Sequence, residues 1–359
     1  VTFWRERSSE RRRRDAQVRD IQTALAAEIR HYTDILRLFD LTEALDVTIA
    51  RMRAEPEYRP RLPSEKNDSV FQAMIGDIHM LPEDVIDPVV RYYSQLIAIV
   101  AMIEDLRSPE FRAAELAQRL ELPLLATGIA PSSCDVPAAL LIVDDQELRL
   151  QLTGRSAPGP VKVDFGSAGM RHRRNSGARE LLGKAVGLGK KPGLRVLDAT
   201  AGLGTDAFVL ADMGCEVELC EREPVIAELL RSGLRVAAGS GDPWLADVVQ
   251  RMSLSPGDAR ELEHAHIQGV DVIYLDPMFP QRRKSAAVKK EMALFQLLLQ
   301  HATDAQDADA LLMWALRQKT PRVVVKRPAK AASLAGQQPS HSINGKSVRY
   351  DVYVHRKLL

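Results

Sequence analysis

A glycine-rich turn between a short apolar run and a helix-like run constrains the fold of this chain most strongly. Residues 196–208 have the sequence VLDATAGLGTDAF, in which a strand ends at Asp198 and a helix begins near Thr205. The glycines allow the backbone to turn sharply and to approach a ligand where a Cβ atom would collide. In an open α/β sheet, ligands bind beyond the carboxyl ends of the strands, against a turn of this kind.

The residues around this turn have the pattern of a parallel sheet. From Gly193 onward, apolar runs alternate with helix-like runs, which is typical of βαβ units. The predicted fold class is therefore α/β, with a doubly wound, Rossmann-like sheet. We expect strands at residues 195–198, 216–220, 270–275 and 322–326, and a closing strand at 349–355.

The length of 359 residues predicts more than one domain. Residues 1–14 are charged and nearly devoid of aliphatic side chains, so we expect a disordered basic tail. Residues 15–108 have apolar side chains at three- and four-residue steps, which predicts an extra helical region that binds an unknown protein partner. Short strand-like runs in residues 109–165 predict a small α/β lead-in subdomain, and residues 166–359 form the main domain.

The composition excludes several classes of protein. Apolar residues make up 45% of the chain, which is enough for a real core. The three cysteines have no metal-ligand spacing, so we expect reduced thiols and no metal site. The longest apolar run, Leu96–Ile103, is far shorter than the roughly 20 residues that cross a bilayer. We therefore expect a cytoplasmic protein that does not span a membrane.

The glycine turn alone fits a nicotinamide cofactor, S-adenosylmethionine (SAM) or a purely structural turn. Gly202 and Gly204 satisfy the G-x-G-x-x-G/A pattern of dehydrogenases as well. Asp198 lies four residues before the first glycine, in the D-x-x-x-G-x-G form that favours SAM, because its carboxylate can face the cationic methionine moiety. Glu221 ends the next strand, where it can accept both ribose hydroxyls of either cofactor.

A second motif follows the predicted strand at 270–275. Residues 272–280 have the sequence VIYLDPMFP, a variant of the (D/N)-P-P-(F/Y) motif of enzymes that methylate planar amines. Asp276 and the carbonyl group of Pro277 can accept the two hydrogens of an exocyclic amine, and Phe279 can stack on the base. We interpret these three residues as catalytic. The alternative is a strand followed by a proline turn.

Four segments resemble the RsmJ (YhiQ) family, in the same order and within residues 109–359. They are VDFGSAGMRHRR, DATAGLGTDAF, LDPMFPQRRKSAAVKKEM and VVVKRP. The resemblance implies a class I SAM-dependent methyltransferase that methylates the N2 amine of a specific guanosine in 16S ribosomal RNA of the small ribosomal subunit.

The resemblance also implies further cofactor contacts. Thr205 stands where the family often has arginine, so we expect a contact through its backbone. Asp258 fits the loop that contacts adenine in this fold, although an ordinary loop residue is the alternative. The implied cofactor contacts are Thr205, Asp206, Glu221, Arg222, Gly257, Asp258 and Asp276.

Basic residues predict a surface for RNA phosphates. One run directly follows the catalytic motif, a second precedes the glycine turn and a third is Lys326-Arg327. Such runs can also be ordinary solvated faces. The predicted RNA-binding residues are Arg171, Arg173, Arg174, Arg282, Arg283, Lys284, Lys289 and Lys290.

Other functions stay open from the sequence. The Asp-Pro motif also suits an amino-methyltransferase that acts on another RNA base or on DNA adenine. A nicotinamide-dependent oxidoreductase would need a proton donor near the glycine turn, and the sequence offers no convincing one. A binding or scaffold role describes the N-terminal helical region best.

Overall fold

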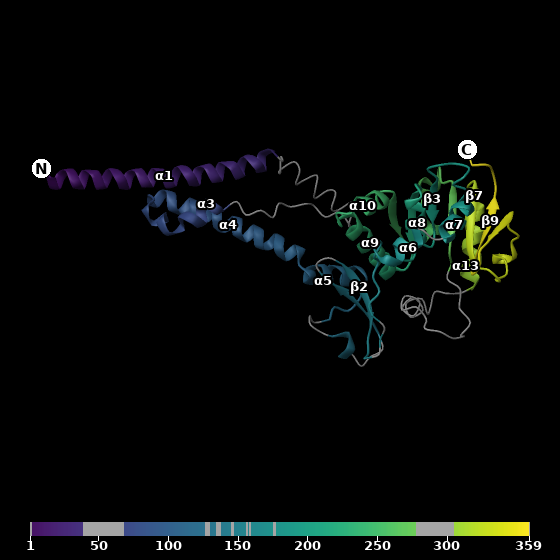
Figure 1. The fold of residues 1–359 in the computed structure, drawn as a ribbon. Helices are drawn as coiled ribbons and strands as arrows, with labels where there is room; N and C mark the ends of the chain where they lie inside the picture. Colours follow the sequence, from purple (N-terminus) through teal and green to yellow (C-terminus); the bar gives the residue numbers. More distant parts are fainter. Residues whose placement is uncertain are drawn as a thin grey trace. The chain divides into compact units, whose positions relative to one another are not determined.

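The computed structural model describes most of the chain as two compact units, Val1–Arg112 and Ala113–Leu359 (Figure 1). The boundary lies inside helix α5 (Pro109–Arg119), close to the end of the predicted helical region. The described residues are 2–38, 68–125, 130–133, 138–144, 147–155, 157, 159–174, 177–277 and 305–358.

The first unit is helical. Its helices are α1 (Thr2–Leu38), α3 (Ser69–Met74) and α4 (Glu83–Arg107), with a 3-10 helix η1 (Ile75–Met80) between the last two. Residues 2–14 belong to α1, so the prediction of a disordered tail is wrong for them. High charge suggested disorder, but arginine and glutamate are also strong helix formers.

A carboxylate of α1 fastens the start of α3. Glu28 accepts hydrogen bonds from the backbone N–H groups of Val70 (2.7 Å) and Phe71 (3.1 Å) and from the Tyr93 hydroxyl (2.6 Å). Burial raises the pKa of Glu28, but these hydrogen bonds outweigh burial and hold the pKa below its ordinary value. The ring of Phe71 stacks on Tyr93 at 3.9 Å. The helices therefore form a packed unit.

The second unit contains a seven-stranded sheet in the order β5-β4-β3-β6-β7-β9-β8. The first five strands in this order are parallel, and β9 is antiparallel to both of its neighbours. This sheet confirms the predicted doubly wound α/β class. The strands are β3 (Arg195–Asp198), β4 (Glu216–Glu221), β5 (Met252–Pro256), β6 (Val272–Leu275), β7 (Arg322–Pro328), β8 (His341–Asn344) and β9 (Val348–Val354).

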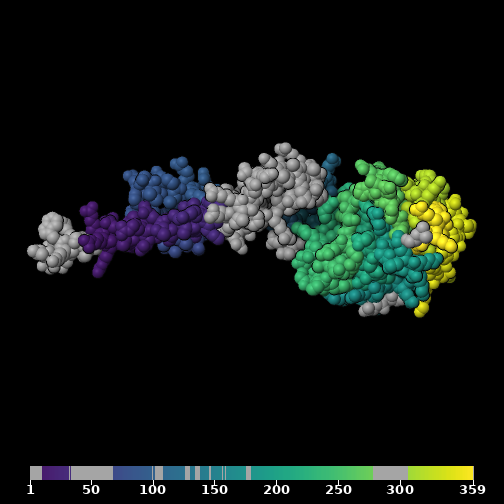
Figure 2. Space-filling view, turned by 90° about the horizontal axis from the view of Figure 1, so that it is seen from above, coloured from purple at the N-terminus to yellow at the C-terminus, as the bar shows by residue number. Residues whose placement is uncertain are grey.

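Helices cover both faces of the sheet. The helices are α6 (Ala168–Arg174), α7 (Gly177–Val186), α8 (Thr205–Asp212), α9 (Pro224–Ala238), α10 (Pro243–Val249), α11 (His264–Ile267) and α13 (Ala305–Arg317). Short 3-10 helices are η2 (Pro131–Ser133), η3 (Ala259–Glu261) and η4 (Leu334–Gly336). In the space-filling view, the yellow C-terminal residues gather on one side of this unit, as expected for β9 and β8 at one edge of the sheet (Figure 2).

Successive residues of the central strands enter two different cores. Val196 packs in the cluster that includes Phe208 of α8, whereas Leu197 packs in the cluster that includes Leu312 of α13. Side chains of a strand alternate between the two faces of its sheet. Strands buried on both faces explain why the predicted strands are continuous apolar runs.

The predicted lead-in subdomain shares the core of the main domain. Strands β1 (Ala139–Val143) and β2 (Leu148–Leu152) form an antiparallel pair. The backbone N–H of Leu148 donates to the Ser232 hydroxyl of α9 (2.9 Å), and Val163 packs directly against Gly233. The boundary expected near residue 165 therefore does not separate two cores.

Two further sequence expectations concern cysteines and membrane spans. Cys215 and Cys220 are buried free thiols, and burial raises the pKa of each to about 12. Cys134 lies outside the described residues. In the described part of the chain, no helix combines the length and apolar character that a bilayer crossing needs.

Gly233→Ala tests the shared core. The added Cβ would collide with the side chain and carbonyl of Val163, so we expect a loss of about 1–3 kcal/mol in stability, seen as a lower melting temperature of the second unit. Gly239→Ala at the end of the same helix is the control, because its Cβ would meet only ordinary contacts at 3.5 Å or more. Equal melting temperatures for the two variants would contradict this packing.

Candidate active site

The polar ends of three parallel strands meet at one edge of the sheet. Asp198 of β3 pairs in register with Leu219 of β4 and Tyr274 of β6. Glu221 ends β4, and Asp276 directly follows β6. Because these strands are neighbours and parallel, the three carboxylates converge beside the glycine turn.

The two glycines of the turn have different physical roles. Gly204 has φ 71° and begins α8, and a Cβ there would strike Leu230 and approach Phe165. Gly202 also has a positive φ of 54°, but a Cβ there would meet nothing within 4 Å. Gly204 is therefore needed for packing, whereas open space next to Gly202 leaves room for a ligand.

Glu221 holds the glycine turn against β4. Its two carboxylate oxygens accept hydrogen bonds from the backbone N–H groups of Gly202 and Glu223, each at 2.8 Å. Burial raises the pKa of Glu221. A carboxylate in this position, at the end of β4, can also accept hydrogen bonds from the hydroxyl groups of a ligand.

Asp198 is almost fully buried, at 2% exposure. Burial, together with the carboxylates of Asp206, Asp276 and Glu221, raises its pKa to about 8, although the N–H of Thr200 donates to it at 3.1 Å. A cationic group beside Asp198 would favour its ionised form. The site therefore fits a ligand that carries a positive charge.

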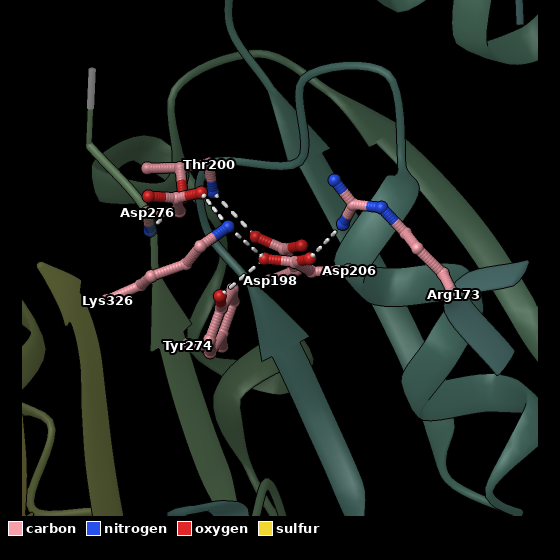
Figure 3. Close-up of polar contacts among 7 residues, drawn as sticks. All are labelled: Arg173, Asp198, Thr200, Asp206, Tyr274, Asp276 and Lys326. Atoms are coloured by element: carbon pink, nitrogen blue, oxygen red, sulfur yellow. Dashed lines mark hydrogen bonds and ion pairs between the residues drawn. The ribbon is translucent and has the colours of Figure 1, made fainter. Parts of the chain in front are cut away.

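Asp206 lies at the centre of a hydrogen-bonded network (Figure 3). One of its oxygens accepts from the Lys326 ammonium group and from the Tyr274 hydroxyl, each at 2.7 Å, and the other accepts from Arg173 at 3.1 Å. Burial raises the pKa of Asp206, but Lys326 and the other donors outweigh burial and lower it overall. The predicted cofactor residue Asp206 thus directs its side chain into the protein.

Asp276 is joined to both the glycine turn and β7. Its backbone N–H donates to the Thr200 hydroxyl at 2.6 Å, and one carboxylate oxygen accepts from Lys326 at 2.8 Å. Its side chain is 38% exposed, and the following Pro277 is buried. The predicted catalytic residue Phe279 lies outside the described residues.

Sequence reasoning missed the roles of Thr200, Tyr274 and Lys326. It assigned Lys326 and Arg327 to phosphate binding, but Lys326 binds two carboxylates, and the buried Arg327 donates to the carbonyl of Ala332 at 2.7 Å. The prediction of a third phosphate-binding cluster is therefore wrong. A lysine within the apolar run VVVKRP was the available signal, because a charge in a buried strand requires a partner.

Two of the predicted cofactor residues, Arg222 and Asp258, have side chains that pair with other residues of the protein. Arg222 pairs with Asp307 of α13 at 2.5 Å, and Arg260 pairs with the same carboxylate at 2.9 Å. Arg260 also pairs with Asp258, whose side chain accepts from the Arg260 backbone N–H and so caps η3. Gly257 has φ 127° and open space around its Cβ direction.

The arginines of α6 lie on an indole ring. The guanidinium groups of Arg171 and Arg174 are 5.1 and 4.8 Å from the ring centre of Trp244. Arg171 also pairs with Asp242 (2.9 Å), and Arg174 with Asp212 (3.2 Å). Both arginines remain about half exposed. The predicted basic residues at 282–290 lie outside the described part of the chain.

Comparison with known proteins identifies the family. A family model described as a putative SAM-dependent methyltransferase matches residues 128–355. Ribosomal RNA small subunit methyltransferase J from Pseudomonas fluorescens (strain Pf0-1) is 49% identical over 253 residues, which cover 69% of this chain and 92% of that protein. The protein of the same name from Thioalkalivibrio sulfidiphilus (strain HL-EbGR7) is 50% identical over 262 residues, 72% of this chain and 97% of the relative.

A solved structure supports the same assignment. The crystal structure of a SAM-dependent methyltransferase from Neisseria gonorrhoeae is 35% identical, with a TM-score of 0.53, and the match covers 69% of this chain and 93% of that chain. The helical unit lies outside the residues that the family model matches. The resemblance drawn from the sequence is confirmed: the chain belongs to the ribosomal RNA small subunit methyltransferase J family and is a class I SAM-dependent methyltransferase.

Proposed function

We propose that the protein transfers a methyl group from SAM to the N2 amine of a specific guanosine in 16S ribosomal RNA. One observation carries the proposal: the backbone N–H of Asp276 donates to the Thr200 hydroxyl at 2.6 Å, so the loop suited to a planar amine is fastened to the glycine turn. The names of the relatives support ribosomal RNA of the small subunit as the substrate. The guanine amine follows from the family resemblance of the motifs.

The residues at the sheet edge fit the cofactor. SAM, when bound, supplies an electrophilic methyl group on a positively charged sulfonium. Glu221 would accept hydrogen bonds from the ribose hydroxyls. Asp198 would face the positively charged part of SAM, and that charge would favour the ionised form of Asp198 against the burial that raises its pKa. The open space beside Gly202 admits the ligand. Other contacts would come from the backbone at Gly204, Thr205 and Gly257, and from Arg222 and Asp258 at the rim.

Asp276 and Pro277 would prepare the amine. The lone pair of an exocyclic guanine amine is delocalised into the ring, so the amine is a weak nucleophile. Hydrogen bonds from its two hydrogens to the Asp276 carboxylate and the Pro277 carbonyl favour a pyramidal nitrogen and point its lone pair toward the methyl group. SAM would supply the methyl group, its S–C bond breaking as the N–C bond forms, and the Asp276 carboxylate would take the proton that the nitrogen loses. Phe279 would stack on the base, which contributes roughly 1–3 kcal/mol.

The arginines of α6 would hold the RNA backbone near the site. A guanidinium group has five N–H donors, so Arg171 and Arg174 can bind a phosphate while they keep one acidic partner each. Arg173, next to Asp206, and the basic residues at 282–290 would extend this surface. We propose a protein partner for the helical unit on the basis of its exposed Ile75 and Ile97. We also propose a cytoplasmic location, which is supported by relatives named as ribosomal RNA methyltransferases.

Asp276→Ala should abolish methyl transfer and reduce SAM affinity far less, because the amine loses its acceptor. The assay uses radiolabelled SAM and small subunits that lack the modification, followed by mass spectrometry of the nucleosides. N2-methylguanosine from the unaltered protein supports the proposal. Label in another RNA base, or in DNA adenine only, would contradict it.

Glu221→Ala should weaken SAM binding about 10–100-fold in calorimetry, because charge-assisted hydrogen bonds contribute about 1.5–3 kcal/mol. Glu216→Gln, at the exposed start of the same strand, serves as the control and should bind as the unaltered protein does. Unchanged affinity in Glu221→Ala would place the ribose elsewhere.

Replacing Arg171 and Arg174 together by glutamine should lower RNA affinity about tenfold at 0.1 M salt and make its salt dependence shallower. SAM affinity should stay the same. Arg195→Gln, at the opposite edge of the sheet, is the control. If the salt dependence of the double variant matched that of the control, the α6 arginines would not contact phosphates.

A further inference from the structure

Lys326 reaches from β7 across the carboxyl edge of the sheet to two carboxylates that belong to different loops. Its ammonium group lies 2.7 Å from Oδ2 of Asp206 and 2.8 Å from Oδ2 of Asp276. The side chain is 20% exposed, and it lies between the start of α8 and the end of β6. Figure 3 shows the ammonium group pointing to the space between the two carboxylates.

Of the two carboxylates, Asp206 is held in place by several hydrogen bonds within the protein. Its side chain is 14% exposed and accepts from Lys326, Tyr274 and Arg173, so three donors serve its two oxygens. These donors keep the pKa of Asp206 low despite its burial. An ionised, fully bonded carboxylate holds the ammonium group of Lys326 in place.

Asp276 is the carboxylate that we propose contacts the substrate. Its backbone N–H is fixed by Thr200 and its Oδ2 by Lys326. Among the described residues, Oδ1 of Asp276 has no hydrogen bond, and the side chain is 38% exposed. One oxygen is therefore bound by Lys326, whereas no described residue binds the other, which leaves it available to a ligand as far as the described residues go.

Without Lys326, burial and the neighbouring carboxylate of Asp206 would oppose the ionisation of Asp276 more strongly. Burial and the neighbouring Asp206 raise the pKa of Asp276 above its ordinary value, and Lys326 and Arg173 offset only part of this rise. Lys326 is the only one of these two cations within hydrogen-bonding distance of Asp276 in the described structure. Within residues 2–277 and 305–358, as far as the structure describes them, the titratable and charged groups that face Asp276 are Asp198 of β3, Asp206 of α8, Arg173 of α6, Tyr274 of β6, Lys326 of β7 and Tyr350 of β9.

We propose that Lys326 is a positioning residue, which binds Oδ2 of Asp276 and so turns Oδ1 toward the amine of the substrate. The role in catalysis rests on the proposed function, whereas the effect of Lys326 on Asp276 can be measured without RNA. Lys326 is thus predicted to act by positioning Asp276 and not by binding a phosphate group of the RNA.

The test compares Lys326→Met and Lys326→Gln with Lys326→Arg and with Lys191→Met. Lys191 is a matched control, because it pairs with Asp271 at 2.8 Å at the opposite end of the same strand β6. Two properties are measured: the titration of the Asp276 carboxyl carbon by NMR, assigned with Asp276→Asn, and the pH dependence of kcat on small-subunit RNA. Melting temperatures show which variants are folded.

Loss of the positive charge should raise the pKa of Asp276 by about 1–3 pH units, because an opposite charge at this distance lowers a carboxyl pKa by that amount. Activity requires ionised Asp276, so the acid limb of the kcat profile should move to higher pH by the same amount. At neutral pH, kcat should fall about tenfold or more and recover in part as the pH rises. Lys326→Arg should keep the Asp276 pKa near that of the unaltered protein, and Lys191→Met should change neither property.

Two results would overturn the proposal. One is an unchanged titration of Asp276 in the folded Lys326→Gln or Lys326→Met variant. The other is a kcat that falls equally at every pH, which indicates a merely structural lysine. If the unaltered protein methylates no ribosomal RNA but the Asp276 titration moves as expected, the proposed function fails and the effect of Lys326 on Asp276 stands.

Discussion

The parallel pairing of β3 with β6 is the interaction on which the site depends. Asp198 lies opposite Tyr274, and the N–H of Ala199 donates to the Tyr274 carbonyl at 3.0 Å. This register brings the glycine turn beside Asp276, which is distant in the sequence, and lets Thr200 hold the Asp276 backbone. A slip by one residue would turn every side chain of β6 to the other face and separate the two loops.

The same edge concentrates negative charge in a poorly hydrated place. Asp206 and Asp276 raise the pKa of Asp198, and Asp206 raises that of Asp276, whereas Lys326 binds Asp206 and Asp276 directly. Buried charges without partners are costly, so this cluster contributes little to stability by itself. Carboxylates with shifted pKa values, next to a loop that leaves room for a ligand, are typical of a functional site. A cationic cofactor would relieve the repulsion among these carboxylates.

Patterns close in the sequence predicted much of this structure, and contacts distant in the sequence were missed. The apolar runs predicted the central strands, and the motifs around Gly202 and Asp276 predicted two loops that the structure places together. The basic pair at Lys326 was misinterpreted because residue type alone does not show which way a side chain points. β7 is an inner strand, so its lysine faces carboxylates. The packing of Val163 on Gly233 likewise joins distant segments.

A crystal structure with S-adenosylhomocysteine, the product of the cofactor, would show directly whether the glycine turn and Asp276 face the same ligand. We expect the ribose hydroxyls to bind Glu221 and the homocysteine amine and sulfur to lie near Asp198. The sulfur should face Oδ1 of Asp276 across the place of the transferred methyl group. An adenosine bound away from the glycine turn, or a sulfur that faces away from Asp276, would show that the two loops do not form one active site.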